Sequence, residues 1–240
     1  MIERIIYFIK KNLKFFFIKL HLISPDNEKP ASIDHITWER FYSLSTHINY
    51  ILETFDSTEF KDLYIGEAGL GNGNTFLYLT LIAEKLGLKI IGFDSFEGFP
   101  EIKNIKDRRL FGKPLKKGQW AVSSVKSIKR KLIISGVNPS FIDKKVELVP
   151  GYFEDSLKIF DKNKKFIFLH LDVDLYSSYK TCLGELWDNV VSGGIVVFDE
   201  YHDKKWPDAK DAIDEFFNKK KITVSVDKLT SRGFVIKKKL

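Results

Sequence analysis

The sequence predicts an α/β protein built around a largely parallel sheet. Short apolar runs alternate with segments of helical periodicity from residue 63 onward, and this alternation is typical of parallel strands covered by helices on both faces. Hydrophobic residues make up 44% of the 240 residues and charged residues 30%, a composition that excludes disordered, collagen-like and disulfide-stapled chains. The single cysteine, Cys182, can form neither an intramolecular disulfide nor a cysteine-based zinc site, so we expect a reducing, cytoplasmic location.

Seven strands are predicted along the chain. They lie at 63–67, 89–93, 146–149, 166–172, 195–199, 222–227 and 232–237. The run 166–172 is apolar through its middle, which is typical of a strand buried on both faces. Gly193-Gly194 is expected to separate the helix at 178–190 from the strand at 195–199. Because the link Leu229–Gly233 is short, the last strand is expected to pair antiparallel, which makes the sheet mixed. Helices are predicted at 37–55, 74–86, 123–135, 153–160, 178–190 and 208–218.

The first 30 residues form a basic extension of the domain predicted at 31–240. Apolar residues within 1–23 recur with helical spacing, but four lysines interrupt them, so no stretch reaches the ~18 uncharged residues of a membrane-spanning helix. A signal peptide would need a longer charge-free core and a small-residue cleavage site. This amphipathic helix has two interpretations. It packs on the domain or on a partner subunit of a homo-oligomer, or it lies on the anionic inner face of a membrane.

A glycine-rich turn follows the first strand. It reads Gly66-Glu67-Ala68-Gly69-Leu70-Gly71-Asn72-Gly73-Asn74, and glycines in such a turn let a ligand approach the backbone. Asp94 ends the next strand, where a carboxylate can accept hydrogen bonds from ribose hydroxyls. Asn74 replaces the third glycine of G-x-G-x-x-G, and Glu67 would repel a pyrophosphate, so charge favours S-adenosylmethionine over NAD. The alternative is a tight turn with no ligand.

Carboxylates follow the fourth and fifth strands. Asp172 ends the fourth, and Asp199 and Glu200 end the fifth, so they converge at one edge of the sheet if these strands are neighbours. Converging carboxylates repel one another unless they are neutralised. Mg²⁺ or another divalent cation prefers such ligands and acidifies a bound hydroxyl, whereas the alternative is simple capping of the following helices. His202 can reach an acceptor here, while His170 lies inside an apolar strand and is predicted to be a core histidine.

The segment 97–135 is strongly basic. Between Lys103 and Lys131 the sequence has 11 lysines and arginines and one acid, Asp107. Such a segment is either a solvated surface or a recognition surface for an anionic acceptor, such as a nucleotide-linked or lipid-linked sugar. Trp120, within it, either covers the acceptor or packs in the fold.

Four segments of the chain together resemble the macrocin/mycinamicin O-methyltransferase family. They are Gly66–Gly73, the DSFEGFP sequence at Asp94–Pro100, Gly151–Leu157, and Leu171–Tyr176 continuing to Gly193-Gly194 and Asp199-Glu200. The similarity runs from about Thr37 to Phe217. It implies a Rossmann-like class I methyltransferase fold with a seven-stranded mixed sheet, and a sugar O-methyltransferase that depends on S-adenosylmethionine and Mg²⁺.

The resemblance also implies roles for single residues. Metal ligands would be Asp172, Asp199 and Glu200, although the family usually has a second aspartate in place of Glu200. The resemblance makes Asp172 the candidate base and 97–135 a lid; His202 is a second candidate catalytic residue because of its position after Asp199-Glu200. By resemblance, Glu67, Gly69, Asp94 and Ser95 match the cofactor site. The further candidate cofactor-binding residues lie in the same segments and are Ala68, Gly71, Gly73, Gly151 and Tyr152.

The expected reaction is methyl transfer to a hydroxyl of a sugar or glycan precursor, as polysaccharide biosynthesis requires. One alternative is a nucleic-acid or catechol-like methyltransferase. No nucleic-acid partner is expected, because the sequence has no N/D-P-P-Y-type tetrapeptide for a flipped base. The other alternative is a non-catalytic, membrane-docked binding module with the same fold.

Overall fold

The computed structural model of the chain describes residues 35–107, 114–230 and 232–238. The extension predicted at 1–30 lies outside these residues, as do Arg108, Arg109 and Lys113 of the basic segment. None of the helices within the described ranges has the length and apolar character needed to cross a bilayer.

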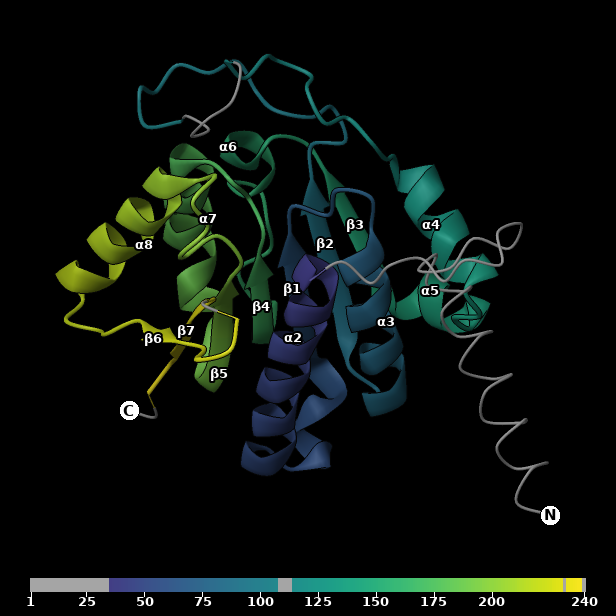
Figure 1. The fold of residues 1–240 in the computed structure, drawn as a ribbon. Coiled ribbons are helices and arrows are strands. Elements are labelled where there is room, and N and C mark those ends of the chain that lie inside the picture. The colour runs from purple at the N-terminus through teal and green to yellow at the C-terminus, as the bar shows by residue number, and fades with distance from the viewer. Residues whose placement is uncertain (1–34, 108–113, 231, 239–240) are drawn as a thin grey trace, which may run out of the picture.

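A seven-stranded sheet forms the centre of the molecule (Figure 1). Its strand order is β3-β2-β1-β4-β5-β7-β6, and β7 runs antiparallel to both of its neighbours while the other pairs are parallel. The predicted mixed sheet with an antiparallel last strand is thereby confirmed. The strands are β1 (Leu63–Ala68), β2 (Lys89–Asp94), β3 (Val146–Pro150), β4 (Lys165–Leu171), β5 (Val190–Phe198), β6 (Ser225–Val226) and β7 (Gly233–Ile236).

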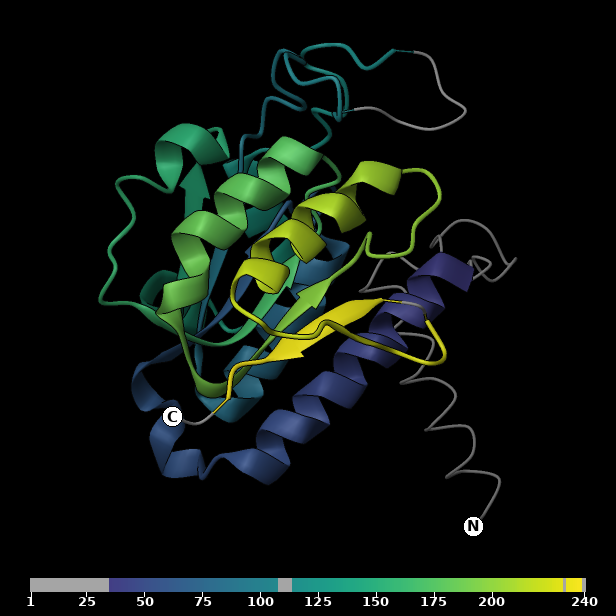
Figure 2. The same cartoon turned by 90° about the vertical axis from the view of Figure 1, so that its left-hand side faces the viewer.

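Helices cover both faces of the sheet (Figures 1 and 2). On one face, α2, α3, α4 and α5 enclose a core that contains Ile51, Phe76 and Leu132. On the other, α6, α7 and α8 pack around Tyr179 and Phe217. The helices are α2 (His35–Thr54), α3 (Asn74–Leu86), α4 (Val125–Ile134), α5 (Pro139–Lys145), α6 (Phe153–Ser156), α7 (Tyr176–Leu186) and α8 (Pro207–Lys219), with short 3-10 turns η1 (Ser57–Asp62) and η2 (Trp187–Asn189).

The glycine pair Gly193-Gly194 lies inside β5 and not between a helix and a strand, so its predicted role was wrong. Gly193 has a φ of +81°, and a Cβ on Gly194 would lie 2.9 Å from Cγ1 of Val190 and 3.0 Å from the carbonyl oxygen of Ile167. The pairing of β5 with β4 shifts its register nearby, between Phe166 and Phe168. The glycines therefore permit an irregular, crowded stretch within β5.

The strand order gathers three carboxyl ends at one edge of the sheet. Strand β4 lies between β1 and β5, with Leu171 beside both Ala68 and Phe198. The fourth and fifth strands are neighbours, as the argument about converging carboxylates requires. Ligands of open α/β sheets bind at this edge.

Candidate functional site

A cavity of about 820 Å³ opens at the carboxyl edge of the sheet. Nine residues predicted to be functional line it, namely Gly69, Gly71, Asp94, Ser95, Tyr152, Asp172, Asp199, Glu200 and His202. The remaining predicted residues, Glu67, Ala68, Gly73 and Gly151, do not line it. Most of the residues predicted from the sequence therefore line one cavity, and the other four do not reach its surface.

The glycine turn is held by Asp94. Oδ2 of Asp94 accepts hydrogen bonds from the backbone N–H groups of Leu70 (2.7 Å) and Gly71 (3.2 Å), and Oδ1 accepts one from Phe96 (2.7 Å). Gly69 has a φ of +82°, and a Cβ there would come within 1.8 Å of the backbone oxygen of Asp172. Only glycine fits where the turn passes over β4. Asp94 therefore orders the turn and also presents its carboxylate to the cavity.

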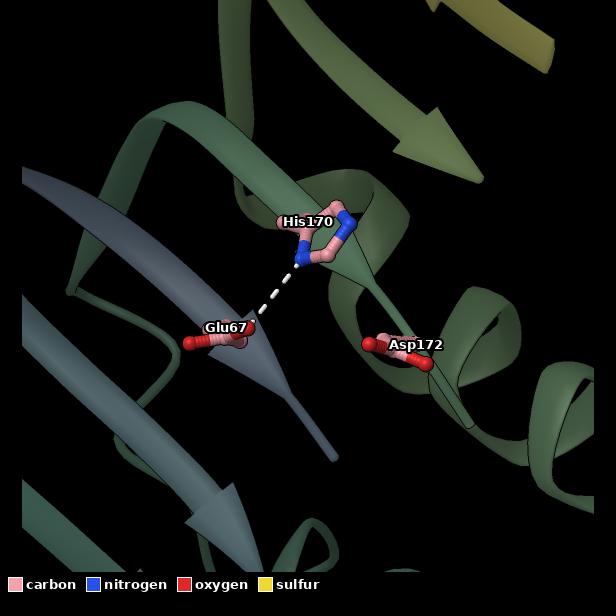
Figure 3. A group of neighbouring side chains, drawn as sticks. All are labelled: Glu67, His170 and Asp172. Atoms are coloured by element: carbon pink, nitrogen blue, oxygen red, sulfur yellow. Dashed lines mark hydrogen bonds and ion pairs between the residues drawn. The ribbon is translucent and has the colours of Figure 1, made fainter. Parts of the chain in front are cut away.

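Glu67 of β1 and His170 of the neighbouring strand β4 form a buried pair (Figure 3). Neither side chain is exposed, and Oε1 of Glu67 lies 3.2 Å from Nδ1 of His170. Nε2 of His170 lies 3.6 Å from Oδ1 of Asp199. Burial alone would lower the pKa of His170, but Asp199 and Glu67 raise it to about 9. His170 is a core residue, as predicted, and it joins β1 to the acidic edge of β5.

Gly73, Ala68 and Gly151 support the site indirectly. Gly73 caps the start of α3 with a φ of +78°, and a Cβ there would meet Cδ1 of Ile128 at 2.3 Å. Ala68 is fully buried at the end of β1, and its carbonyl accepts the backbone N–H of Asp172 at 3.0 Å. Gly151, with a φ of +128°, donates its N–H to the carbonyl of Asp94 at 3.0 Å.

Three carboxylates converge in the wall of the cavity. Oxygens of Asp172, Asp174 and Glu200 lie within 4.8 Å of one another. Oε2 of Glu200 accepts hydrogen bonds from the Tyr179 hydroxyl (2.6 Å) and the backbone N–H of Asp174 (3.3 Å). Burial, together with the neighbouring carboxylates, raises the pKa of both Glu200 and Asp174 well above its ordinary value. Among the described residues only Asp172 of the three has an ion-pair partner, so negative charge on Asp174 and Glu200 is poorly compensated.

Asp199 is engaged differently from the other predicted metal ligands. Its oxygens accept hydrogen bonds from Nε and Nη2 of Arg40 (3.0 and 2.6 Å) and from Nε of Arg232 (2.7 Å). Nη1 of Arg40 also lies 3.2 Å from Oδ2 of Asp172. Burial would raise the pKa of Asp199, but Arg40, His170 and Arg232 hold it well below its ordinary value. The structure places Asp199 at the predicted edge, within a compensated ion-pair network.

Part of the cavity has an aromatic wall. Phe99, Trp120 and Trp206 all line it, and their rings contact one another with centroids 5.1–5.8 Å apart. Trp120 has a φ of +67°, and is held above the cavity because Phe99 and Gln119 pair through their backbones at 2.9 Å. Strained residues of this kind concentrate at functional sites. Trp120 therefore packs against Phe99 and Trp206 and also lines the cavity.

The cations of segment 97–135 that the structure describes do not line the cavity. Lys106 donates to Glu215 at 3.0 Å and sits over the Tyr176 ring at 4.5 Å. Lys131 donates to the carbonyl of Asn72 (2.6 Å) and to Oδ1 of Asn74 (2.7 Å). These lysines tie the segment to α8 and to the glycine turn.

Sequence reasoning missed several residues of the site, and four of them contact its acidic residues or its aromatic wall. They are Arg40, Asp174, Trp206 and Arg232, and all of them line the cavity. Arg40 is the single lysine or arginine in the 20 residues of α2, a signal that could have drawn attention to it. Asp174 lies two residues after Asp172, and its φ of +58° turns the backbone back towards Glu200.

The chain is similar to known O-methyltransferases. The family described as macrocin-O-methyltransferase (TylF) matches residues 65–238. Demethyldecarbamoylnovobiocin O-methyltransferase of Streptomyces niveus is 35% identical over 79 residues, which are 33% of this chain and 29% of that protein. The match therefore spans less than a third of that relative.

Solved structures share the fold. The O-methyltransferase NovP is 18% identical with a TM-score of 0.72, and the alignment covers 94% of this chain and 98% of that one. The calicheamicin methyltransferase CalS11 is 16% identical with a TM-score of 0.71, over 94% and 92% of the two chains. The predicted Rossmann-like methyltransferase fold is confirmed by these likenesses.

Proposed function

Because the chain belongs to the macrocin O-methyltransferase family, we propose that it transfers the methyl group of S-adenosylmethionine to a hydroxyl of an anionic sugar or glycan precursor. The resemblance identified in the sequence is confirmed by that family match. One observation carries the proposal: a single cavity of about 820 Å³ is lined both by the Asp94-ordered glycine turn and by the converging carboxylates. A cofactor and an acceptor can therefore meet in one enclosure.

The part of the cavity formed by Asp94 and the glycine turn has donor and acceptor groups that suit S-adenosylmethionine. Asp94 offers a carboxylate to ribose hydroxyls, and the glycine turn leaves the backbone accessible. When bound, the cofactor supplies a methyl group on a positively charged sulfonium. Carboxylates along the wall attract this charge, and the fixed turn orients it.

The carboxylate cluster suits a divalent cation. Asp172, Asp174 and Glu200 bring three oxygen ligands within 4.8 Å, and hard cations prefer oxygen ligands. When bound, such a cation supplies charge that makes a nearby hydroxyl more acidic. Asp172 and His202 line the cavity, and one of the two accepts the single proton that the hydroxyl loses.

We place Asp199 behind this ligand set, as the anchor of Arg40 and Arg232. The sequence predicts Asp199 as the third ligand, whereas the distances favour Asp174. Calorimetric titration of Mg²⁺ into the protein saturated with S-adenosylhomocysteine separates the two. Asp174→Asn is expected to weaken Mg²⁺ binding by at least about tenfold and Asp199→Asn by less than about threefold.

Glu154→Gln is the matched control, because Glu154 lines the cavity outside the cluster. The opposite order of effects would restore the ligand set predicted from the sequence. If wild-type protein binds no Mg²⁺, the metal part of the proposal is wrong.

Turnover tests the reaction itself. We expect label from S-adenosylmethionine to appear in a member of a panel of glycosyl phosphates. Asp172→Asn should abolish this transfer while the Kd for S-adenosylhomocysteine stays within about tenfold. Equal loss of binding and turnover would contradict the role of Asp172.

Binding of the N-terminal extension to a membrane or to a partner subunit stays a prediction. Removing residues 1–23 should release the protein from anionic vesicles if the basic helix docks on a membrane, and should dissociate a homo-oligomer if the helix packs on a partner. Vesicle flotation and light scattering distinguish the two.

A further inference from the structure

Two lysines of the loop between β5 and α8 line the cavity. Lys204 and Lys205 are exposed and belong to the wall of the enclosure that also holds Trp120 and Glu200. Neither forms an ion pair with any residue that the structure describes, in contrast to Arg40 and Arg232, which are bound to Asp199. The charge of the two ammonium groups is therefore available to a ligand.

Hydrogen bonds hold the backbone of the loop that carries these lysines against Glu200. The backbone N–H of Asp203 donates to the carbonyl of Glu200 (3.1 Å), and that of Lys205 donates to Oδ1 of Asp203 (2.7 Å). Trp206 closes the turn by donating its N–H to the carbonyl of Asp203 at 3.1 Å. A compact turn thus joins Glu200 to the lysine pair.

The aromatic wall stands next to the lysine pair. Trp206 follows Lys205 directly and is 3% exposed, whereas Trp120, whose ring centroid lies 5.7 Å away, is 44% exposed. Trp206 therefore serves as the buried base of the wall, and Trp120 offers ring surface to a ligand. Apolar rings with a few placed polar groups are typical of small-molecule sites.

We propose that Lys204 and Lys205 form a phosphate subsite for the acceptor, so that the methylated sugar is a glycosyl phosphate or diphosphate whose ring lies against Trp120. Phosphate esters carry one to two negative charges and several acceptor oxygens, which two adjacent ammonium groups match. This inference rests on the proposed function, because the subsite presents the sugar hydroxyl to the carboxylate cluster. It assigns acceptor recognition to the loop after β5 and not to the basic segment 97–135.

Calorimetry in the presence of S-adenosylhomocysteine tests the subsite. The probes are glucose 1-phosphate, UDP-glucose, prenyl-diphosphate-linked glucose in micelles, neutral methyl glucoside and inorganic phosphate. We expect the phosphate-bearing sugars to bind at least about tenfold more tightly than methyl glucoside or inorganic phosphate. The double variant Lys204→Ser/Lys205→Ser should lose this preference.

The matched control is Lys116→Ser/Lys117→Ser. It removes the same charge from an adjacent, exposed lysine pair that does not line the cavity, so its affinity for the phosphate-bearing sugars should stay within about twofold of wild type. If this control lost as much affinity for the phosphate-bearing sugars as the loop variant, the basic segment 97–135 would recognise the acceptor and the proposal would be overturned. Equal binding of inorganic phosphate and glucose 1-phosphate would overturn it as well, since the lysines would then hold an adventitious ion only.

The remaining arms identify the source of the phosphate. Tighter binding of UDP-glucose indicates a nucleotide-linked acceptor, and tighter binding of the prenyl diphosphate indicates a lipid-linked one. Both results support the phosphate subsite. Failure of the subsite and of the proposed function are distinguishable, because the loop variant should retain the wild-type Kd for S-adenosylhomocysteine. Absent cofactor binding in wild type would refute the methyltransferase assignment instead.

Discussion

Replacing Gly98 by alanine should detach the part of segment 97–135 that carries Trp120. Gly98 has a φ of +75°, and a Cβ there would lie 2.3 Å from the carbonyl oxygen of Gln119 and 2.7 Å from that of Gly118. These atoms are backbone, so they cannot rotate away as a side chain could. The two stretches must separate to admit the methyl group.

The structure offers a matched substitution that isolates this clash. Gly118 has a φ of +78°, yet a Cβ there would have its nearest neighbour, the carbonyl oxygen of Glu97, at 3.8 Å. Both alanine variants bear the left-handed penalty of about 1–2 kcal/mol. Only Gly98→Ala also breaks the two 2.9 Å backbone hydrogen bonds that Phe99 makes with Gln119 and Gly118. At about 0.5–1.5 kcal/mol each, these add about 1–3 kcal/mol.

Urea denaturation measures the difference in free energy of unfolding between the two variants. We expect Gly98→Ala to be less stable than Gly118→Ala by about 1–3 kcal/mol, and its Trp120 emission to shift to the red as the ring leaves the wall. Trp120→Phe provides the reference for that signal. Equal stability of the two glycine variants would refute the claim that backbone contact holds Trp120 over the cavity.

Three further substitutions test the interior of the site. Burial and neighbouring carboxylates raise the pKa of Glu200 above its ordinary 4.5, so its charged form destabilises the fold as pH rises beyond that value. Glu200→Gln should therefore melt at a higher temperature than wild type at pH 8 in EDTA, and a lower Tm would contradict the charge argument. His170 has a pKa of about 9 against 6.5 when unfolded, so its stabilisation is complete below pH 6.5 and is lost as pH rises through 9. Between pH 6.5 and 9.5, the decrease in Tm should be smaller in His170→Gln than in wild type. An equal decrease in both proteins would argue against a charged imidazole. Gly69→Ala would place a Cβ 1.8 Å from the backbone oxygen of Asp172, whereas a Cβ on Gly71 meets nothing within 4 Å. Gly69→Ala should weaken S-adenosylhomocysteine binding by more than about tenfold, and the control Gly71→Ala should not. Similar losses in both variants would show that the clash is harmless.

Local patterns in the sequence were sufficient to predict most of the fold. The helix at 74–86 was predicted with the bounds of α3, because a glycine turn, an apolar stripe and Gly87 mark its start and end. Helix α5 was missed, although Asn138 caps it and Pro139 occupies its first turn. Seven residues give too little periodicity to stand out. Strand β6 has two residues where six were expected, because it pairs only with β7, at the edge of the sheet.

The long-range parts of the site could not be predicted in the same way. Asp172, Asp199 and Glu200 were found because parallel strands bring their carboxyl ends together. Arg40 comes from a helix 159 residues before Asp199, and no spacing rule connects the two. Its position decides that Asp199 is compensated while Asp174 and Glu200 are not. The roles of Lys204 and Lys205 likewise depend on which cations already have partners, and this is visible only in three dimensions.

The proposed reaction requires that the Asp94-ordered turn form a working S-adenosylmethionine site next to the carboxylate cluster. Titration of the purified protein with S-adenosylhomocysteine by calorimetry, with and without Mg²⁺, tests it most directly. We predict one site per chain with a Kd on the order of micromolar, or about −8 kcal/mol, and a loss of at least about tenfold in Asp94→Asn. Absence of binding under both conditions would contradict the claim.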